Sequence, residues 1–238
     1  MRQLFLVAFV VASCQHFTLA HAADAPAATP ADPEKPNPAF AKIVDDPRLP
    51  RVLLIGDSIS IGYTLPVRER LSGKANVHRI PTNGGPTFEG LKHLDDWLGN
   101  EKWDVIHFNW GLGDLKDMRT PEAIAAGEPG KRQVSPDQYR KNLEDLVRCL
   151  KKSGAKLIWA STVPVPAGVK GRVPDEVRYN EIAAEVMSAE QVAIDDLYSI
   201  AKPRSRELQI FDGHFTPEGS RVLAVGVADS ILEVLGAR

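Results

Sequence analysis

A serine and a histidine lie in short polar segments near opposite ends of the sequence, and together they could perform nucleophilic catalysis. The serine, Ser58, stands in Gly56-Asp57-Ser58-Ile59-Ser60, directly after an apolar run. A serine hydroxyl attacks an ester carbonyl when a base removes its proton, and backbone N–H groups at such a turn can stabilise the resulting oxyanion. The spacing is not that of the G-x-S-x-G nucleophile elbow, because Gly62 follows four residues later. A serine here can equally cap the next helix, so this motif alone leaves both roles open.

His214 is the histidine best placed to act as the base. It lies in Asp212-Gly213-His214-Phe215-Thr216-Pro217-Glu218-Gly219, just before a Thr-Pro helix start. An imidazole titrates near neutral pH, and Asp212 could hold the ring in one tautomer. We expect structural roles for the three histidines within predicted strands or helices, which are His78, His93 and His107.

These segments resemble the blocks of the SGNH, or GDSL-type, esterase and lipase superfamily, in the family's order over about residues 51–235. The first block looks like Gly56-Asp57-Ser58 and the last like residues 212–219. Between them, Asn83-Gly84-Gly85-Pro86-Thr87 resembles the second block. The resemblance implies that Ser58 is the nucleophile, His214 the base and Asp212 the acid. It also implies that the backbone N–H groups of Ser58 and Gly85 bind the oxyanion.

The sequence departs from the family pattern at two places. The third block usually reads G-x-N-D, with the asparagine donating to the oxyanion, but here Gly113 takes that position. The amide of Asn109, at the end of the same predicted strand, could substitute, or it could tie the loop. The last block commonly reads D-x-x-H, whereas Asp212 precedes His214 by only two residues. Asp212 could reach the imidazole if the loop bends; otherwise a Ser–His dyad remains.

Strand-like and helix-like segments alternate from Arg51 onward. Short apolar runs, typical of strands buried on both faces of a parallel sheet, occur at 51–55, 77–80, 104–110, 155–160 and 192–194. Helical apolar spacing follows the start signals at Ser135 and Thr216 and recurs near residues 177–186. The pattern predicts an α/β fold, a three-layer α/β/α sandwich with a five-stranded parallel sheet, and the resemblance implies the flavodoxin-like SGNH hydrolase fold.

Ligands bind beyond the carboxyl ends of the strands in such sheets, where both candidate segments would lie. The loop between Lys116 and Val134 follows the third predicted strand, so it would overhang the site. It is either a lid or substrate wall, or a solvated surface excursion. Asp195 and Asp196, after the last predicted strand, are expected to be structural or helix-capping.

Composition excludes several classes of function. The chain has 238 residues, enough for one sizeable domain, and a net charge of −2, unlike the basic excess of nucleic-acid binders. It contains no P-loop, no complete GxGxxG, no CxxC and no HExxH, which disfavours nucleotide cofactors and a structural zinc site. We therefore expect no cofactor and no metal.

The N-terminal residues resemble an export signal. Arg2 precedes an apolar run too short to span a bilayer, and Ala20-His21-Ala22 suits signal-peptide cleavage. This predicts a signal peptide over 1–22, an Ala/Pro-rich linker over 23–45 and a hydrolase domain over 46–238, located in the periplasm or outside the cell. Alternatively, Val11-Ala12-Ser13-Cys14 resembles a lipobox, and a lipoprotein would be anchored at Cys14.

The sequence thus predicts a monomeric serine esterase that acts on short acyl groups, acetyl above all, carried by a carbohydrate or another small molecule. A lysophospholipase or thioesterase of the same family is the alternative within enzymes. A sugar-binding protein without activity is the alternative outside them, because Gly113 replaces the expected asparagine.

Overall fold

The computed structural model describes residues 36–166, 168–210 and 212–236. The predicted signal peptide, Cys14 and the linker up to Lys35 lie outside these residues. The described chain contains a five-stranded parallel sheet in the order β2-β1-β3-β4-β5. Its strands are β1 (Arg51–Ile55), β2 (Asn76–Arg79), β3 (Val105–Phe108), β4 (Lys156–Ala160) and β5 (Ala193–Asp195). The five predicted strands are confirmed, with bounds within two residues.

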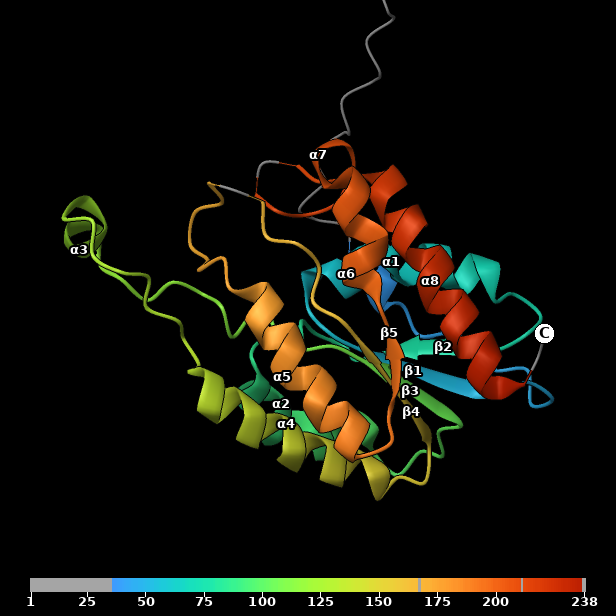
Figure 1. Cartoon of the computed structure of the whole chain (residues 1–238). Coiled ribbons are helices and arrows are strands. Elements are labelled where there is room, and N and C mark those ends of the chain that lie inside the picture. The colour runs from blue at the N-terminus through green and yellow to red at the C-terminus, as the bar shows by residue number, and fades with distance from the viewer. Residues whose placement is uncertain (1–35, 167, 211, 237–238) are drawn as a thin grey trace, which may run out of the picture. The chain divides into compact units, whose positions relative to one another are not determined.

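Two hydrophobic cores lie on opposite faces of the sheet, because side chains alternate along each strand. In β1, Leu53 and Ile55 join one core, while Val52 and Leu54 join the other. Helices α2, α4 and α5 cover the first face, and α1 and α8 cover the second (Figure 1). These helices are α1 (Ser58–Arg70), α2 (Thr87–Leu98), α4 (Pro136–Lys151), α5 (Glu176–Ala189) and α8 (Pro217–Leu235). The predicted three-layer sandwich is therefore confirmed.

Local capping explains where two of these helices begin. Ser135 accepts a hydrogen bond from the backbone N–H of Gln138 at the start of α4, over 3.3 Å. Thr216 accepts one from Gly219 at the start of α8, over 3.0 Å. In both helices a proline follows the cap, where its missing N–H costs nothing. The start of α8 fixes the end of the loop that carries His214.

Residues 36–45, which the sequence places in the linker, contact the domain. The short 3-10 helix η1 (Pro38–Phe40) buries Ala39, and Arg68 donates to the carbonyls of Pro38 and Ala41. The carboxylate of Asp45 lies 2.7 Å from both Arg51 and His78. This segment therefore covers the edge of the sheet at β2.

The loop over 116–134 forms a projecting arm. Isolated bridges join Lys116 to Arg172 and Asp117 to Arg132 at its base. Its tip holds α3 (Pro121–Ala125), which has no buried residue and stands away from the layers in Figure 1. The remaining short helices, between β5 and the last loop, are α6 (Leu197–Ala201), η2 (Lys202–Arg204) and α7 (Ser205–Leu208). Within the described ranges, no helix combines the length and apolarity needed to cross a membrane.

Candidate active site

Ser58 is the first residue of α1, immediately beyond the carboxyl end of β1. Asp57 caps this helix, its carboxylate accepting from the backbone N–H of Ile59 over 2.9 Å. The capping role that the motif allowed for Ser58 therefore falls to its neighbour. The N–H of a residue at this position has no partner within the helix and lies at the positive end of the helix dipole. The half-buried Ser58 thus combines a hydroxyl with a favourable backbone donor.

His214 faces Ser58 across the edge of the sheet. The ring Nε2 lies 2.9 Å from Ser58 Oγ, although the two residues are 156 positions apart. The loop that carries the ring is a tight turn: Ile210 donates to the carbonyl of His214 over 2.8 Å, and Thr216 donates to that of Leu208 over 2.8 Å. These bonds fix the backbone on both sides of the imidazole.

Asp212 reaches the imidazole despite the shortened D-x-H spacing. One carboxylate oxygen, Oδ1, lies 3.0 Å from His214 Nδ1 and accepts the backbone N–H of His214 over 3.0 Å. The intervening Gly213 has φ +88°, in the left-handed region, and this turns the chain back on itself. These bonds, the backbone one most, lower the pKa of Asp212 despite partial burial. The structure therefore brings Ser58, His214 and Asp212 together.

We expect Asp212→Asn to lower kcat for a short aryl ester by about 10- to 100-fold. This is less than the roughly 10⁴-fold loss for a buried triad aspartate, because the Asp212 side chain is 44% exposed and water can partly replace it. Steady-state kinetics at saturating ester measure the effect. Asp229→Asn, on α8, serves as the surface control. Wild-type turnover in Asp212→Asn would show that the carboxylate does not orient the ring.

The loop containing Gly85 packs directly against the nucleophile turn. The backbone N–H of Gly84 donates to the carbonyl of Gly56 over 2.9 Å. The N–H of Gly85 donates to the side-chain oxygen of Asn83, also over 2.9 Å. Since Asn83 is exposed, another acceptor can displace its side chain. Gly85 is thus positioned beside Ser58 with an N–H that is held by a replaceable partner.

Gly113, which stands where the family has asparagine, is required by close packing between loops. A Cβ built at this position would lie 2.6 Å from the backbone nitrogen of Pro86 and 2.7 Å from the carbonyl carbon and oxygen of Gly85. The Gly85–Pro86 peptide therefore occupies the space that a side chain at 113 would need. The position of the second loop and an asparagine at 113 therefore exclude each other.

Asn109 ties two strands together at the floor of the site. Its side-chain nitrogen donates to the carbonyl of Ala160, over 2.7 Å, and lies 3.4 Å from Thr162 Oγ1. Both amide hydrogens are therefore directed to β4 and the loop after it. This corresponds to the loop-tying alternative for Asn109, so the structure offers no free Asn109 N–H for an oxyanion.

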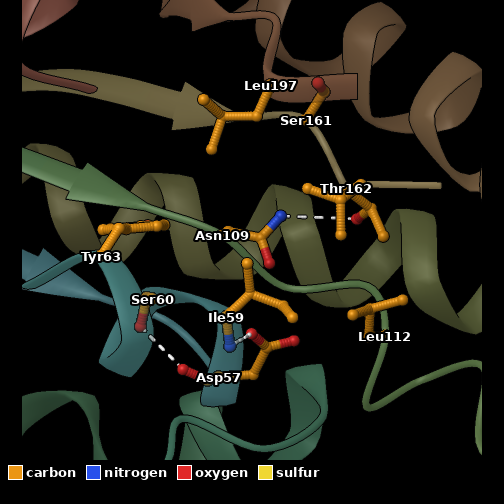
Figure 2. A pocket seen from close by; sticks show the side chains of 10 residues that line it. Asp57, Ile59, Ser60, Tyr63, Asn109, Leu112, Ser161, Thr162 and Leu197 are labelled. Carbon is orange, nitrogen blue, oxygen red and sulfur yellow. Dashed lines mark hydrogen bonds between the residues drawn. The ribbon is translucent and has the colours of Figure 1, made fainter. Parts of the chain in front are cut away.

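A small enclosed cavity lies beneath the nucleophile turn, next to Asn109 (Figure 2). Its volume of about 10 Å³ is roughly the room needed by one water molecule. Its lining mixes polar and apolar side chains, which include Asp57, Ser60, Tyr63, Leu112 and Thr162. This cavity is thus too small to hold an acyl chain.

Asp114 supports the second loop from below. Its Oδ1 accepts from both the N–H and the hydroxyl of Thr87, the first residue of α2, over 2.9 Å and 2.5 Å. Its Oδ2 is buried and has no hydrogen-bond partner in the described structure. Burial raises the pKa of Asp114 to about 7. This carboxyl group therefore holds its proton up to near-neutral pH.

The raised pKa of Asp114 predicts a loss of stability with rising pH. An unfolded aspartate ionises near pH 3.9, so between about pH 4 and 7 only the native state keeps this proton, and the free energy of unfolding falls as pH rises. Asp114→Asn keeps the acceptor for Thr87 and does not titrate. We expect wild type to lose on the order of 2–4 kcal/mol relative to Asp114→Asn between pH 4 and 8. Urea unfolding of both proteins across this range tests it, and parallel curves would contradict it.

The remaining predicted side chains have structural contacts. His107 and Asp195 form a buried pair, with 2.9 Å between His107 Nε2 and an Asp195 oxygen. Asp196 caps α6 by accepting from the N–H of Ser199 over 3.1 Å. His78 pairs with Asp45, and His93 lies near Glu89 on α2. Among the described residues, no three His, Cys, Asp or Glu side chains cluster closely enough to hold a metal ion.

One residue near the site has no counterpart in the sequence prediction. Arg79, at the end of β2, is only 9% exposed and contacts both the first and the second loop. The signal that could have identified Arg79 is a charged residue at the end of a mostly buried strand, β2.

The family match over most of the domain defines the chain as an esterase- or lipase-type hydrolase. Residues 54–222 match the GDSL-like Lipase/Acylhydrolase family, and the chain belongs to this family, whose members include the SGNH hydrolases. Most of the described domain, including the segments around Ser58, Gly85 and His214, lies within the match.

Solved structures share this fold at low identity. A lipase/acylhydrolase from Enterococcus faecalis is similar with a TM-score of 0.64 and 22% identity, over 76% of this chain and 95% of that protein. The acetyl xylan esterase AlAXEase is similar with a TM-score of 0.62 and 16% identity, over 76% and 99%. An SGNH hydrolase from Slackia heliotrinireducens is similar with a TM-score of 0.57 and 22% identity, over 77% and 100%. No curated protein matches the chain significantly.

Proposed function

We propose that the protein is a serine esterase that hydrolyses short-chain acyl esters, with acetyl esters of carbohydrates as its substrate class. The observation that carries this proposal is the connected series of side chains from Ser58 through His214 to Asp212. It supports roles as nucleophile, base and orienting acid for these three residues, at the edge of the sheet where α/β proteins bind ligands. None of the alternative, non-catalytic roles requires these three side chains to be connected.

The hydrogen bonding assigns a direction to proton transfer. When His214 Nδ1–H donates to Asp212, Nε2 carries the free lone pair and accepts the proton of Ser58. Ser58 Oγ then forms a bond to the ester carbonyl carbon while its proton moves to Nε2. Collapse of the tetrahedral intermediate breaks the ester C–O bond, and His214 returns the proton to the departing alcohol. A water molecule, activated by the same base, then releases the acid from Ser58.

The oxyanion would be held by backbone donors. The N–H of Ser58 lies at the start of α1, and that of Gly85 becomes available when the exposed Asn83 side chain turns away. Both belong to backbone segments that hydrogen bonds hold together, so they need little reorganisation during the reaction. Asn109 is left out of this arrangement because its amide is directed to Ala160.

The preference for a short acyl group rests on the closed floor of the site. The cavity lined by Asp57, Ser60 and Asn109 has room for about one water molecule and none for an alkyl chain. The similarity to an acetyl xylan esterase supports an acetyl group on a carbohydrate. A lysophospholipase or thioesterase would need space for a longer acyl chain.

A graded ester panel with active-site labelling tests the function. We expect p-nitrophenyl acetate to be hydrolysed with a kcat/KM at least about tenfold above that of the octanoate, and acetylated xylan to release acetate. A fluorophosphonate probe should label Ser58, identified by peptide mass spectrometry, and should label Ser230→Ala equally. Preference for the octanoate would favour the lipase alternative. A folded protein that neither hydrolyses esters nor reacts with the probe would indicate a binding protein without activity.

We also propose that the protein is exported and acts as a monomer. The apolar run after Arg2 and the Ala20-His21-Ala22 segment support cleavage after Ala22, with a lipid anchor at Cys14 as the alternative. The intact mass of the protein recovered from cell fractions distinguishes them, since a mature chain beginning at Ala23 and one beginning at a lipidated Cys14 differ in mass. Sedimentation of the mature protein measures its oligomeric state.

A further inference from the structure

Arg79 contacts residues on both sides of the nucleophile. Its Nη2 donates to the carbonyl of Gly56 over 3.1 Å and to the hydroxyl of Ser60 over 3.0 Å. That hydroxyl donates in turn to the carbonyl of Asp57 over 2.8 Å. One guanidinium group therefore holds, directly or through Ser60, the two peptide carbonyls that precede Ser58.

The same guanidinium reaches the second loop. Arg79 Nη2 lies 3.5 Å from the carbonyl of Thr82, at the start of the segment that leads to Gly85. Gly84 shares the carbonyl of Gly56 with Arg79, since both donate to it. Arg79 thus lies at the junction of the two loops whose N–H groups, at Ser58 and Gly85, are the proposed oxyanion donors.

Arg79 brings a buried positive charge, and the carboxylate that acts on it most is Asp57, in the nucleophile turn. Among the described residues it forms no ion pair, and its Nε and Nη1 are buried without hydrogen-bond partners. Burial lowers the pKa of Arg79 to about 10, so the group remains charged at neutral pH. Phe40, from the N-terminal segment, lies over the guanidinium with 5.2 Å between Cζ and the ring centroid, a cation–π arrangement that shields the charge from water.

The site lacks a side-chain donor for the oxyanion, so its backbone donors must be held in place. Gly113 has no side chain, and Asn109 directs its amide to Ala160. A charged donor makes stronger hydrogen bonds than a neutral one, so the guanidinium is suited to hold the Gly56 carbonyl and the Ser60 hydroxyl in place. An unpaired buried charge also lowers folding stability, so its presence at this junction calls for a role beyond packing.

We propose that Arg79 is a positioning residue that fixes the two loops bearing the oxyanion donors, in a site where the family's asparagine is missing. This inference rests on the proposed esterase function. It assigns Phe40 a part as well, because the N-terminal segment keeps water away from the guanidinium.

Variants of Arg79 separate geometry from charge. We expect Arg79→Met to lower kcat for p-nitrophenyl acetate by about 10²-fold, the loss typical of one oxyanion donor, with KM within threefold. Arg79→Lys keeps the charge and loses the bridging geometry, so it should recover part of kcat, to within about tenfold of wild type. The control is Arg148→Met, because Arg148 lies on α4, where it pairs with the neighbouring Asp145. Its kcat should remain within threefold of wild type.

Affinity for a boronic acid provides a second measurement. Methylboronic acid forms a tetrahedral anion on an active serine, and its inhibition constant should weaken in Arg79→Met in parallel with kcat while KM stays constant. A merely structural role would lower the folded fraction, measured by thermal unfolding, without this selective effect. An active wild type with an unchanged kcat in Arg79→Met, or equal losses in Arg79→Met and Arg148→Met, would overturn the inference alone. If Arg79→Met does not fold, an Arg79→Lys variant with wild-type kcat and boronate affinity would contradict the positioning role. A wild type that hydrolyses no ester and resists the fluorophosphonate probe would overturn the proposed function together with this inference.

Discussion

Ser58→Ala is expected to lower kcat for p-nitrophenyl acetate by about 10³- to 10⁶-fold, the range seen when a serine hydrolase loses its nucleophile. The hydroxyl is the only group at this position that can form the acyl-enzyme, and among the described residues its hydrogen-bond partner is His214. Alanine also suits the first turn of a helix, so the fold should persist. Steady-state kinetics with purified protein, beside a circular dichroism melt, measure both effects.

His214→Ala should produce a loss of similar size, because nucleophile and base act as one unit. The double variant should be little worse than either single variant. Ser230→Ala, whose hydroxyl contacts only a carbonyl within α8, is the control and should match wild type. Full activity in Ser58→Ala, with fluorophosphonate labelling elsewhere, would move the nucleophile to another residue.

Most of the fold could be predicted because buried parallel strands appear in the sequence as short runs of apolar residues. The run at 51–55 lies between two cores, and its burial on both faces explains why its residues are mostly apolar. The last strand shows the limit of this signal. In β5 only Asp195 is buried, so its bounds depend on pairing with β4 rather than on its own pattern.

The site was less accessible to sequence reasoning, because its geometry depends on long-range partners. Whether Asp212 reaches the imidazole depends on the positive φ of Gly213 and on the bonds that close the turn. Whether Asn109 can donate to a substrate depends on the carbonyl of Ala160, which lies 51 residues further along the chain. The role of Arg79 depends on loops that precede and follow it. Residue type identifies such candidates, but only the fold shows what each side chain contacts.

Gly113→Asn restores the family's residue and is nevertheless expected to inactivate the protein. The new Cβ would lie 2.6–2.7 Å from the backbone of Gly85 and Pro86, where no flexible side chain can move aside. The second loop must therefore shift, carrying the Gly85 N–H away from the oxyanion. We expect kcat to fall by about 10²- to 10³-fold, as when one such donor is lost, and stability to fall by about 1–3 kcal/mol through overpacking.

Two comparisons make the Gly113 result decisive. Gly113→Ala introduces the same Cβ without an amide, so a steric cause predicts losses close to those of Gly113→Asn. Gly73→Asn places the same side chain where a Cβ meets no atom within 4 Å, at φ +70°, which asparagine tolerates, and it should retain full activity. Gly113→Asn could instead raise kcat above wild type while Gly113→Ala does not. That result would show that the new amide donates to the oxyanion and that the second loop can move to make room for it. Close packing of the two loops would then not be the reason why asparagine is absent from position 113.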